Sequence, residues 1–308
     1  MHSSESVDGV MQERADVLIV GGGPAGLTAA IYLARFRRSV ILLDALQSRA
    51  AKIPRSHNYP GFVDGITGSA LLESLRKQLD AYPVRRVNAY AEHAWHDGDG
   101  FGVRWPTGSA RGKLMLLATG VDDIAPPTPY ELESLRNGTL RYCPICDGYE
   151  VIGREVGVYA DGAAGVGEAI YLRHFTPHIT LFMQAGAAAL TDEDRTRLAE
   201  ADIRCVEEPL RSVHSWNERV TVVHGESETS CDSLYCALGV RVHATLALAL
   251  GAECDETRYL AVDAHQQTTV DGLYAAGDVT QGLNQIVVAT GGAAVAASAM
   301  HRRLAPLR

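Results

Sequence analysis

Short apolar runs and longer stretches of helical spacing alternate along this chain. Near its start, the apolar runs at 17–20 and 40–43 flank a glycine-rich turn at 21–26 and a helical stretch at 27–36. A short apolar run bounded by turn residues is typical of a strand buried on both faces, as in a parallel sheet. The pattern therefore predicts strand, turn, helix and strand in the first part of the chain.

The same alternation continues to the end. It predicts helices over 69–81, 162–175 (with its turn), 191–201 and 285–304, and strands over 113–118, 156–159, 179–182, 204–206, 220–223, 234–238, 260–262 and 273–276. Strands that alternate with helices indicate an α/β fold with parallel sheets. Two units open with strand, glycine-containing turn and helix, so we expect two Rossmann-like dinucleotide-binding domains, each with three layers (ββα).

The order of these patterns indicates that one domain is inserted into the other. A chain of 308 residues exceeds one comfortable core, so two domains are expected. The proline-rich stretch 126–129 is typical of a boundary, and the last strands and helix resume the pattern of the first unit. We expect an outer domain of residues 15–122 plus 255–308 and an inserted domain of residues 123–254.

Composition narrows the class of protein. The apolar fraction is 46%, which is ample for a globular core, and the net charge is −9, from 28 basic and 37 acidic residues. Phosphate backbones need clustered Lys and Arg, so nucleic acid is not an expected partner. Residues 1–14 are polar and lack the apolar core of a secretory signal. No segment has an uninterrupted apolar run long enough to span a bilayer. We expect a cytoplasmic protein without a membrane partner.

The first glycine turn has the spacing of a dinucleotide fingerprint. Gly21, Gly23 and Gly26 form G-x-G-x-x-G between a strand and a helix, and Asp44 ends the next strand. Such glycines permit a tight turn and close approach of a pyrophosphate to the helix N-terminus, while the acid binds the ribose. The residues expected to contact the dinucleotide here are Gly21, Gly23, Pro24, Ala25, Gly26 and Asp44.

A second cofactor signal lies near the end of the chain. Gly277-Asp278 follows the strand predicted at 273–276, and a helix begins near residue 285. An aspartate at a strand end can hold a ribityl hydroxyl, and a helix N-terminus stabilises negative charge on a reduced flavin. Together with the glycine turn, this pair indicates a flavin dinucleotide.

Cys143-Pro144-Ile145-Cys146-Asp147 carries the candidate chemistry. Two cysteines with this spacing can form an exchangeable disulfide that transfers two electrons. The competing interpretation, a zinc site, needs four ligands. Cys231 and Cys236 are the only other close pair, and on one extended stretch their side chains would point to opposite faces. We interpret Cys205, Cys231, Cys236 and Cys254 as small buried apolar residues, and we expect no metal site.

Five motifs in this order resemble the low-molecular-weight thioredoxin reductases over nearly the whole chain after residue 15. They are Gly21–Gly26, Asn58-Tyr59-Pro60-Gly61-Phe62, Ala118-Thr119-Gly120, Cys143-Pro144-Ile145-Cys146-Asp147-Gly148 and Tyr274-Ala275-Ala276-Gly277-Asp278. The resemblance implies FAD on the outer segments, a redox disulfide on the inserted domain, a homodimer, and two domains that rotate. Its further implied FAD contacts are Asn58, Ala118, Thr119, Gly120, Gly277, Asp278, Asn284, Gln285 and Ile286.

The resemblance also implies roles for the catalytic residues. Cys146 would be the sulfur nearest the flavin, Cys143 the sulfur that meets the substrate, and Asp147 the acid/base. The substrate would be a thioredoxin-like protein or a small dithiol or disulfide.

The inserted domain departs from this family at the expected NADPH site. Its turn is Ala160-Asp161-Gly162-Ala163-Ala164-Gly165, with alanine for the first glycine and an acid where a pyrophosphate would lie. After the next strand, where the family has a His-Arg-Arg run for the 2′-phosphate, residues 183–189 read Met-Gln-Ala-Gly-Ala-Ala-Ala. Both halves of the site are changed, which argues against NADPH.

Three functions remain open from the sequence. The preferred one is an FAD-dependent thiol/disulfide oxidoreductase without NADPH as donor, either a dithiol oxidase or an enzyme with another electron donor. The second is an NADPH-dependent thioredoxin reductase. The third is a flavin-bearing redox sensor or partner-binding protein without turnover.

Overall fold

The computed structural model describes residues 12–216 and 218–304, which form two compact units. The outer unit comprises residues 12–51, 68–122 and 242–304, and the inserted unit comprises residues 52–67 and 123–241, apart from residue 217. The two-stranded sheet of β7 (Val121–Asp123) and β16 (Val240–Val242) forms where the chain passes between them.

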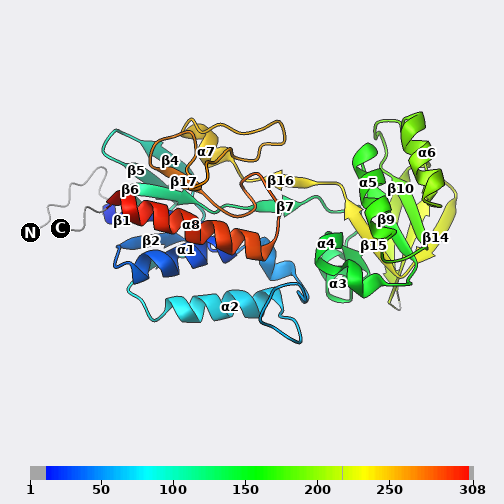
Figure 1. The fold of residues 1–308 in the computed structure, drawn as a ribbon, viewed down its shortest axis with the longest axis horizontal. Coiled ribbons are helices and arrows are strands. Elements are labelled where there is room, and N and C mark those ends of the chain that lie inside the picture. The colour runs from blue at the N-terminus through cyan, green and yellow to red at the C-terminus, as the bar shows by residue number, and fades with distance from the viewer. Residues whose placement is uncertain (1–11, 217, 305–308) are drawn as a thin grey trace, which may run out of the picture. The chain divides into compact units, whose positions relative to one another are not determined.

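The outer unit is built on a seven-stranded sheet (Figure 1). Its order is β3-β2-β1-β6-β5-β4, with β17 also paired to β6. The strands are β1 (Gln12–Val20), β2 (Val40–Leu43), β3 (Arg85–Val87), β4 (His93–His96), β5 (Phe101–Trp105), β6 (Gly108–Leu117) and β17 (Leu273–Ala275). Strands β1, β2, β3, β6 and β17 pair in parallel, and β4 and β5 add an antiparallel extension.

Helices cover this sheet. They are α1 (Pro24–Arg35), α2 (Gly68–Leu79), α7 (Thr245–Ala249) and α8 (Ile286–Leu304), with a 3-10 turn η1 (Arg49–Lys52). The α1 helix packs against both α8 and α2, and its leucines and three of its four alanines are buried, as are all four residues of β2. The burial of β2 follows from its continuous apolar run, which is typical of a strand covered on both faces.

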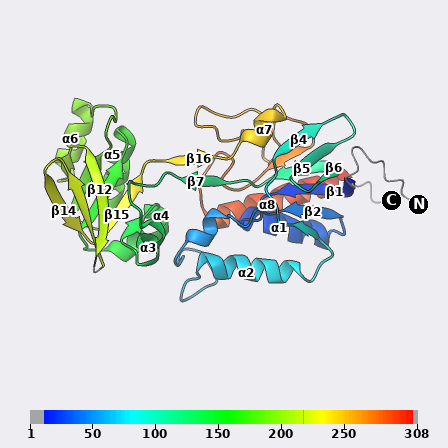
Figure 2. The same cartoon turned by 180° about the vertical axis from the view of Figure 1, so that it is seen from behind.

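The inserted unit has three layers (Figure 2). Its central parallel sheet has the order β11-β10-β9-β15-β8. The strands are β8 (Leu140–Arg141), β9 (Val156–Ala160), β10 (Ile179–Met183), β11 (Arg204–Val206) and β15 (Ser233–Ala237). One face packs on α5 (Ala163–Leu172) and α6 (Asp192–Glu200), and the other on an antiparallel sheet of β12 (Leu210–Trp216), β13 (Arg219–His224) and β14 (Ser227–Cys231). Two short helices, α3 (Glu131–Arg136) and α4 (Pro144–Asp147), and a 3-10 turn, η2 (Gly148–Val151), complete it.

The two Rossmann-like folds and most central elements are those that the sequence predicts. Thr191 caps α6 in a capping box with Asp194, so the predicted start of that helix is confirmed. In the described part of the chain, no helix is both long and apolar enough to cross a bilayer.

Two predicted elements are wrong. The predicted strand at 17–20 begins earlier: β1 starts at Gln12 and pairs with β6 from Ser109 onward, so residues 12–14 of the polar segment 1–14 belong to the sheet, while residues 1–11 lie outside the described residues. Residues 260–262 form no strand, and Leu260 makes only isolated bridges. The Asp255 carboxylate accepts a hydrogen bond from the backbone N–H of Tyr259, and Asp263 does the same for Gln267, so both flanks are held in turns.

The unit boundaries also differ from the expected ones. The chain returns to the outer unit at Val242 rather than at residue 255, and residues 52–67 group with the inserted unit. The reason for the first difference is local: β16 pairs with β7, and α7 packs on β4 of the outer unit.

Candidate functional site

In the first glycine turn, Gly21 and Gly26 leave no room for a side chain. Gly21 has φ +112°, and a Cβ on it would lie 2.1 Å from the carbonyl oxygen of Ala118. A Cβ on Gly26 would lie 1.8 Å from the carbonyl oxygen of Gly21, so α1 packs directly on the end of β1. No side chain caps α1 at Gly23, and Pro24 follows at the first helical position. The N-terminus of α1 is therefore available to an anion such as a pyrophosphate.

Asp44 lies against this turn. It is 6% exposed, and a Cβ on Gly22 would lie 2.0 Å from its carboxyl carbon. One carboxylate oxygen accepts a hydrogen bond from the N–H of Leu46 at 2.8 Å, and the other pairs with Arg76 at 3.2 Å. The structure thus brings the predicted ribose-binding acid to the predicted pyrophosphate turn, and adds an arginine from α2 that the sequence did not indicate.

The residues predicted near the flavin from the end of the chain adjoin the same turn. Gly277 has φ +82°, and a Cβ on it would lie 3.0 Å from the Cβ of Ala25 in α1. The next residue, Asp278, forms an ion pair with Arg49 of η1 at 3.2 Å. The end of β17 and the start of α1 therefore meet, as a dinucleotide that spans both would require.

The start of α8 offers a further polar group. The Asn284 side chain donates to the hydroxyl of Tyr259 at 3.0 Å, while its Oδ1 atom is buried with no hydrogen-bond partner. The carbonyl of Gln285 accepts from Ala289, just before α8 begins at Ile286. A buried acceptor without a donor fits a ligand that donates there. The glycine cradle, the acid beside it and this orphaned oxygen fit FAD in the outer unit.

Two other predicted contacts have partners within the protein. The hydroxyl of Thr119 donates to the carbonyl of His243 at 2.7 Å, and Gly120 has φ +68°. Asn58 groups with the inserted unit, where its amide donates to the carbonyl of Ile145 at 3.3 Å. Asn58 therefore contacts the segment between the two cysteines of the motif.

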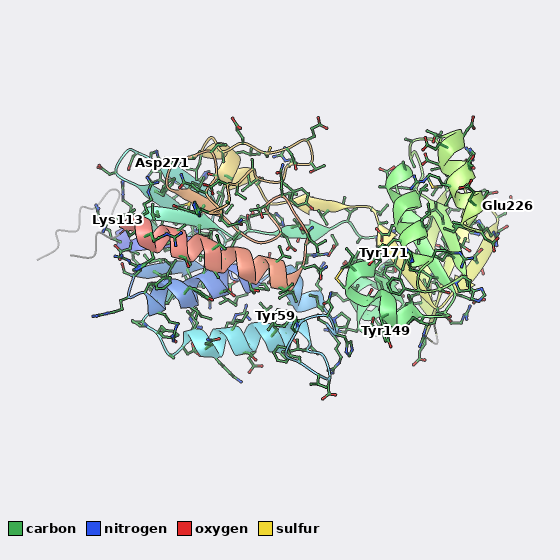
Figure 3. All side chains as sticks on the ribbon, viewed as in Figure 1. Tyr59, Lys113, Tyr149, Tyr171, Glu226 and Asp271 are labelled. Carbon is green, nitrogen blue, oxygen red and sulfur yellow. A yellow bond between two sulfur atoms is a disulfide. The ribbon has the colours of Figure 1, made fainter. Side chains whose placement is uncertain are left out.

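The cysteine motif forms the start of α4. Cys143 and Cys146 are joined by a disulfide, and Cys143 is the N-cap of the helix. The N–H of Cys146 donates to the Cys143 sulfur at 3.1 Å. A hydrogen bond and a helix N-terminus both stabilise a thiolate at Cys143. Ile145 between the cysteines is 47% exposed, and Tyr149 after them is 77% exposed. Tyr149 is labelled in Figure 3.

Asp147 is bound from two sides. Arg141 donates to its Oδ2 atom at 2.7 Å, and the hydroxyl of Tyr235 donates to its Oδ1 atom at 2.8 Å. Burial raises the pKa of Asp147 above its usual range, and the charge of Arg141 and the bond from Tyr235 oppose that rise. The predicted acid/base therefore lies beside the disulfide in a setting that makes it more basic than a free carboxylate.

The four other cysteines differ in part from the prediction. Cys231 and Cys236 are buried, but both pack into one cluster between the sheets, because the chain turns between β14 and β15. The opposite orientation was expected only for one extended stretch, and the two cysteines lie on two different strands. Cys205 and Cys254 are only partly buried. Among residues 12–216 and 218–304, no three His, Cys, Asp or Glu side chains gather as metal ligands would.

The turn after β9 differs from the turn after β1. The position that corresponds to Gly21 is Ala160, which remains a fully buried strand residue, and the positive φ of +65° occurs two residues later, at Gly162. The segment after β10 folds onto this turn: the Cβ and carbonyl oxygen of Ala188 lie 3.8 Å from where a Cβ of Gly162 would be. Asp161 is exposed at the turn.

Comparison with known proteins places this architecture. The sequence profile of the pyridine nucleotide-disulphide oxidoreductases matches residues 15–293. The chain belongs to this family. It is 31% identical to the thioredoxin reductase of Treponema pallidum, over 94% of this chain and 97% of that protein. Members of this kind are FAD-dependent disulfide oxidoreductases, and the chain is a thioredoxin reductase-like enzyme.

Solved structures agree. The crystal structure of HlmI superposes with a TM-score of 0.86 at 28% identity, covering 98% of this chain and 95% of HlmI. Thioredoxin reductase from Streptococcus pyogenes superposes with a TM-score of 0.87 at 25% identity, covering 95% and 99%. Both show the two-domain fold described above.

Sequence reasoning missed four side chains at these sites: Arg49, Arg76, Arg141 and Tyr235. Arg141 lies two residues before Cys143, so a cation next to a reactive thiol could have been suspected. Tyr235 is 88 residues from Asp147, and no local pattern joins them.

Proposed function

We propose that this protein is an FAD-dependent thiol/disulfide oxidoreductase in which electrons pass between the flavin and the Cys143–Cys146 disulfide without NADPH as the normal donor. The outer unit supplies a cradle that fits FAD, and the inserted unit supplies the exchangeable disulfide with Asp147 beside it. The Cys143–Cys146 disulfide can accept electrons directly from a dithiol by thiol/disulfide exchange.

The turn after β9 is the observation that supports a donor other than NADPH. Ala160 continues the strand where a nucleotide-binding turn needs glycine, and the Cβ and carbonyl oxygen of Ala188 lie 3.8 Å from where a Cβ of Gly162 would be. Asp161 adds a negative charge where a pyrophosphate would lie. The segment 184–189 contains no arginine or lysine to bind a 2′-phosphate and no acid to bind a ribose.

Each exchange step has a defined role for the residues of this chain. A substrate thiolate attacks the sulfur of Cys143, the bond to Cys146 breaks, and Cys146 leaves as a thiolate. The second substrate thiol then releases Cys143, so the substrate is oxidised to a disulfide and the cysteine pair is reduced. Asp147 holds and returns the proton that these steps move. Bound FAD would supply a two-electron acceptor for the reduced cysteine pair, with oxygen or another oxidant as the final acceptor.

An anaerobic titration of the purified yellow protein tests this proposal. Flavin absorbance is followed during addition of NADPH and, separately, of dithiothreitol. We expect rapid bleaching by the dithiol, inertness to micromolar NADPH, and loss of bleaching by the dithiol in Cys143→Ser. Rapid bleaching by NADPH would overturn the proposal, as would dithiol turnover that survives Cys143→Ser.

The second candidate is an NADPH-dependent thioredoxin reductase, and one feature favours it. Gly165 retains the close helix packing of a dinucleotide fold, and no side chain caps α5 at Gly162. One relative, 29% identical, is the NADPH-dependent thioredoxin reductase 3 of Arabidopsis thaliana; this chain covers 60% of its length. Gln184→Arg with Ala185→Arg should then sharply improve NADPH affinity, and no improvement would argue against a merely weakened site.

Partner and assembly are part of this proposal. The substrate is a thioredoxin-like protein or a small dithiol or disulfide, and the exposed Ile145 and Tyr149 beside the cysteines give it an apolar surface to meet. We propose a cytoplasmic homodimer, which size-exclusion chromatography with light scattering would check. A redox sensor without turnover ranks last, because the cysteine pair has a positioned acid/base; steady-state thiol turnover far above the enzyme concentration would eliminate it.

A further inference from the structure

Arg141 is fixed in place more tightly than an ordinary surface arginine. Its Nε atom donates to the hydroxyl of Ser233 at 3.2 Å, and Nη1 donates to Asp147 at 2.7 Å. Its Nη2 atom lies 3.0 Å from where a Cβ of Gly138 would be, and Gly138 has φ +75°, so a side chain at that position would be strained and would crowd the guanidinium. The side chain of Arg141 is 17% exposed. A guanidinium held by two hydrogen bonds keeps a positive charge at one place beside the carboxylate.

Tyr235 holds the other side of the same carboxylate. It is fully buried in β15, and its hydroxyl donates both to the Oδ1 atom and to the backbone carbonyl of Asp147. With Arg141 on Oδ2, each carboxylate oxygen accepts a hydrogen bond from a different strand of the central sheet. Hydrogen bonds to both oxygens favour the ionised form.

The other groups around Asp147 act in the opposite direction. Burial raises the pKa of Asp147, and the carboxylate of Glu150 in η2 adds to the rise. Glu168 lies on α5, which packs against α4, and the cysteine sulfurs are at the start of α4 itself. A carboxylate that is kept ionised by two donors yet is more basic than in water is suited to accept a proton.

We propose that Arg141 and Tyr235 are positioning residues that hold Asp147 as the proton acceptor when a substrate dithiol attacks the Cys143–Cys146 disulfide. This inference rests on the proposed function and adds the residues that position its acid/base. The carboxylate takes the proton of the attacking substrate thiol as the new sulfur–sulfur bond to Cys143 forms. The bond to Cys146 breaks, and Asp147 then returns the proton to that thiolate, so electrons and protons balance within the exchange.

Disulfide opening by dithiothreitol, measured without the flavin signal, tests this role. The reaction is run at pH values from 5.5 to 8.5 and is quenched in acid at set times. Free thiols are then alkylated and counted from the mass of the intact protein by mass spectrometry. The variants are Arg141→Met, Arg141→Lys, Tyr235→Phe, Asp147→Asn and the double variant Arg141→Met with Asp147→Asn. Dividing each rate by the wild-type rate at the same pH removes the ionisation of dithiothreitol itself.

Matched controls come from the same unit. Arg219→Met removes ion pairs with Glu155 and Asp232, and Tyr159→Phe changes a buried tyrosine in the core cluster on the other face of the sheet. Both should stay within twofold of wild type at every pH.

Without Arg141 the pKa of Asp147 rises further, so the carboxylate is protonated at higher pH. Arg141→Met should therefore be about tenfold slower at pH 6.5 and approach the wild-type rate near pH 8.5. Arg141→Lys should recover most of the loss, Tyr235→Phe should lose about threefold, and Asp147→Asn roughly a hundredfold. In the Asp147→Asn background, Arg141→Met should cost less than twofold more, because its action passes through Asp147.

Three results for Arg141→Met would overturn the proposal. The first is an equal loss of the disulfide-opening rate at all pH values. The second is a further tenfold loss when Arg141→Met is added to Asp147→Asn, and the third is a rate faster than wild type at pH 6.5. The last result would mean that Asp147 acts in its protonated form, as a proton donor to the Cys146 thiolate, and not as the acceptor of the proton of the attacking thiol. If the variants behave as expected but dithiothreitol never bleaches the flavin, the positioning role stands and the proposed electron path fails. The two failures are therefore distinguishable.

Discussion

Ala160 and Gly165 face each other across the strand-to-helix turn of the inserted unit so closely that only one of them can carry a side chain. A Cβ on Gly165 would lie 2.0 Å from the Cβ of Ala160. In the outer unit the corresponding residues, Gly21 and Gly26, are both glycine, and the turn begins one residue after β1 ends. In the inserted unit the methyl group is on the strand, which continues through Ala160.

This relationship predicts a reciprocal rescue. Gly165→Ala should destabilise the inserted unit by about 1–3 kcal/mol, because two methyl groups would then share one space. Combining it with Ala160→Gly should recover part of the loss, so the two changes should be strongly non-additive. The measurement is urea unfolding of the single and double variants.

The control for this prediction is Gly167→Ala, in the same helix. A Cβ there meets nothing within 4 Å, so this change should stabilise the protein slightly, by about 0.5–1 kcal/mol. If the changes in unfolding free energy caused by Ala160→Gly and Gly165→Ala simply add in the double variant, the turn relaxes around the extra methyl group. That result would contradict a steric conflict between the two residues.

A second prediction concerns FAD retention. Gly21→Ala introduces a Cβ at φ +112° and 2.1 Å from the carbonyl oxygen of Ala118, so the turn must move away from its present shape. We expect the purified variant to contain less than about a tenth of the wild-type flavin per protein, since a misplaced turn loses its close contact with the pyrophosphate. Absorbance at flavin and protein wavelengths gives this ratio.

Gly251→Asn is the matched control for that experiment. Gly251 also has a positive φ, of +90°, but a side chain there meets no atom within 4 Å. It should retain wild-type flavin. Full flavin content in Gly21→Ala would contradict the assignment of the dinucleotide to this turn.

A third prediction uses the orphaned amide oxygen of Asn284. Asn284→Leu removes an acceptor that is buried without a partner in the protein. If FAD donates to this oxygen, the variant should bind FAD about tenfold more weakly while its apoprotein unfolds at the same or a higher urea concentration. If Asn284→Leu instead lowers the stability of the apoprotein, the asparagine has a structural role through its bond to Tyr259.

The sequence predicts the parts of this protein that depend on local pattern. Buried strands such as β2 and the cap of α6 at Thr191 follow from apolar runs and from side chain-to-backbone bonding over three residues. The glycine turn at Gly21 was also recognisable, because its spacing reflects steric limits within one turn.

What the sequence did not predict depends on contacts between distant segments. Tyr235 and Arg141 meet Asp147 only because β15 and β8 are neighbours in the sheet. The strand expected at 260–262 fails because Asp255 and Asp263 close turns on either side of it. Tertiary pairing and local side-chain bonding outweighed the short apolar run in that case.

A final prediction concerns Glu168, a partly buried carboxyl on α5. Burial raises its pKa to about 7, and its Oε1 atom is buried without a hydrogen-bond partner. Because the folded state binds this proton more tightly than the unfolded state, the stabilising effect is fully present below pH 4.5 and is lost as pH rises from 4.5 to about 7. Glu168→Gln should therefore match wild type near pH 4 and exceed its unfolding free energy by about 1–2 kcal/mol at pH 8.5. Urea unfolding at both pH values measures this difference, with the exposed Glu193→Gln on α6 as control. A stability difference that does not change with pH would mean that Glu168 is not the group that titrates.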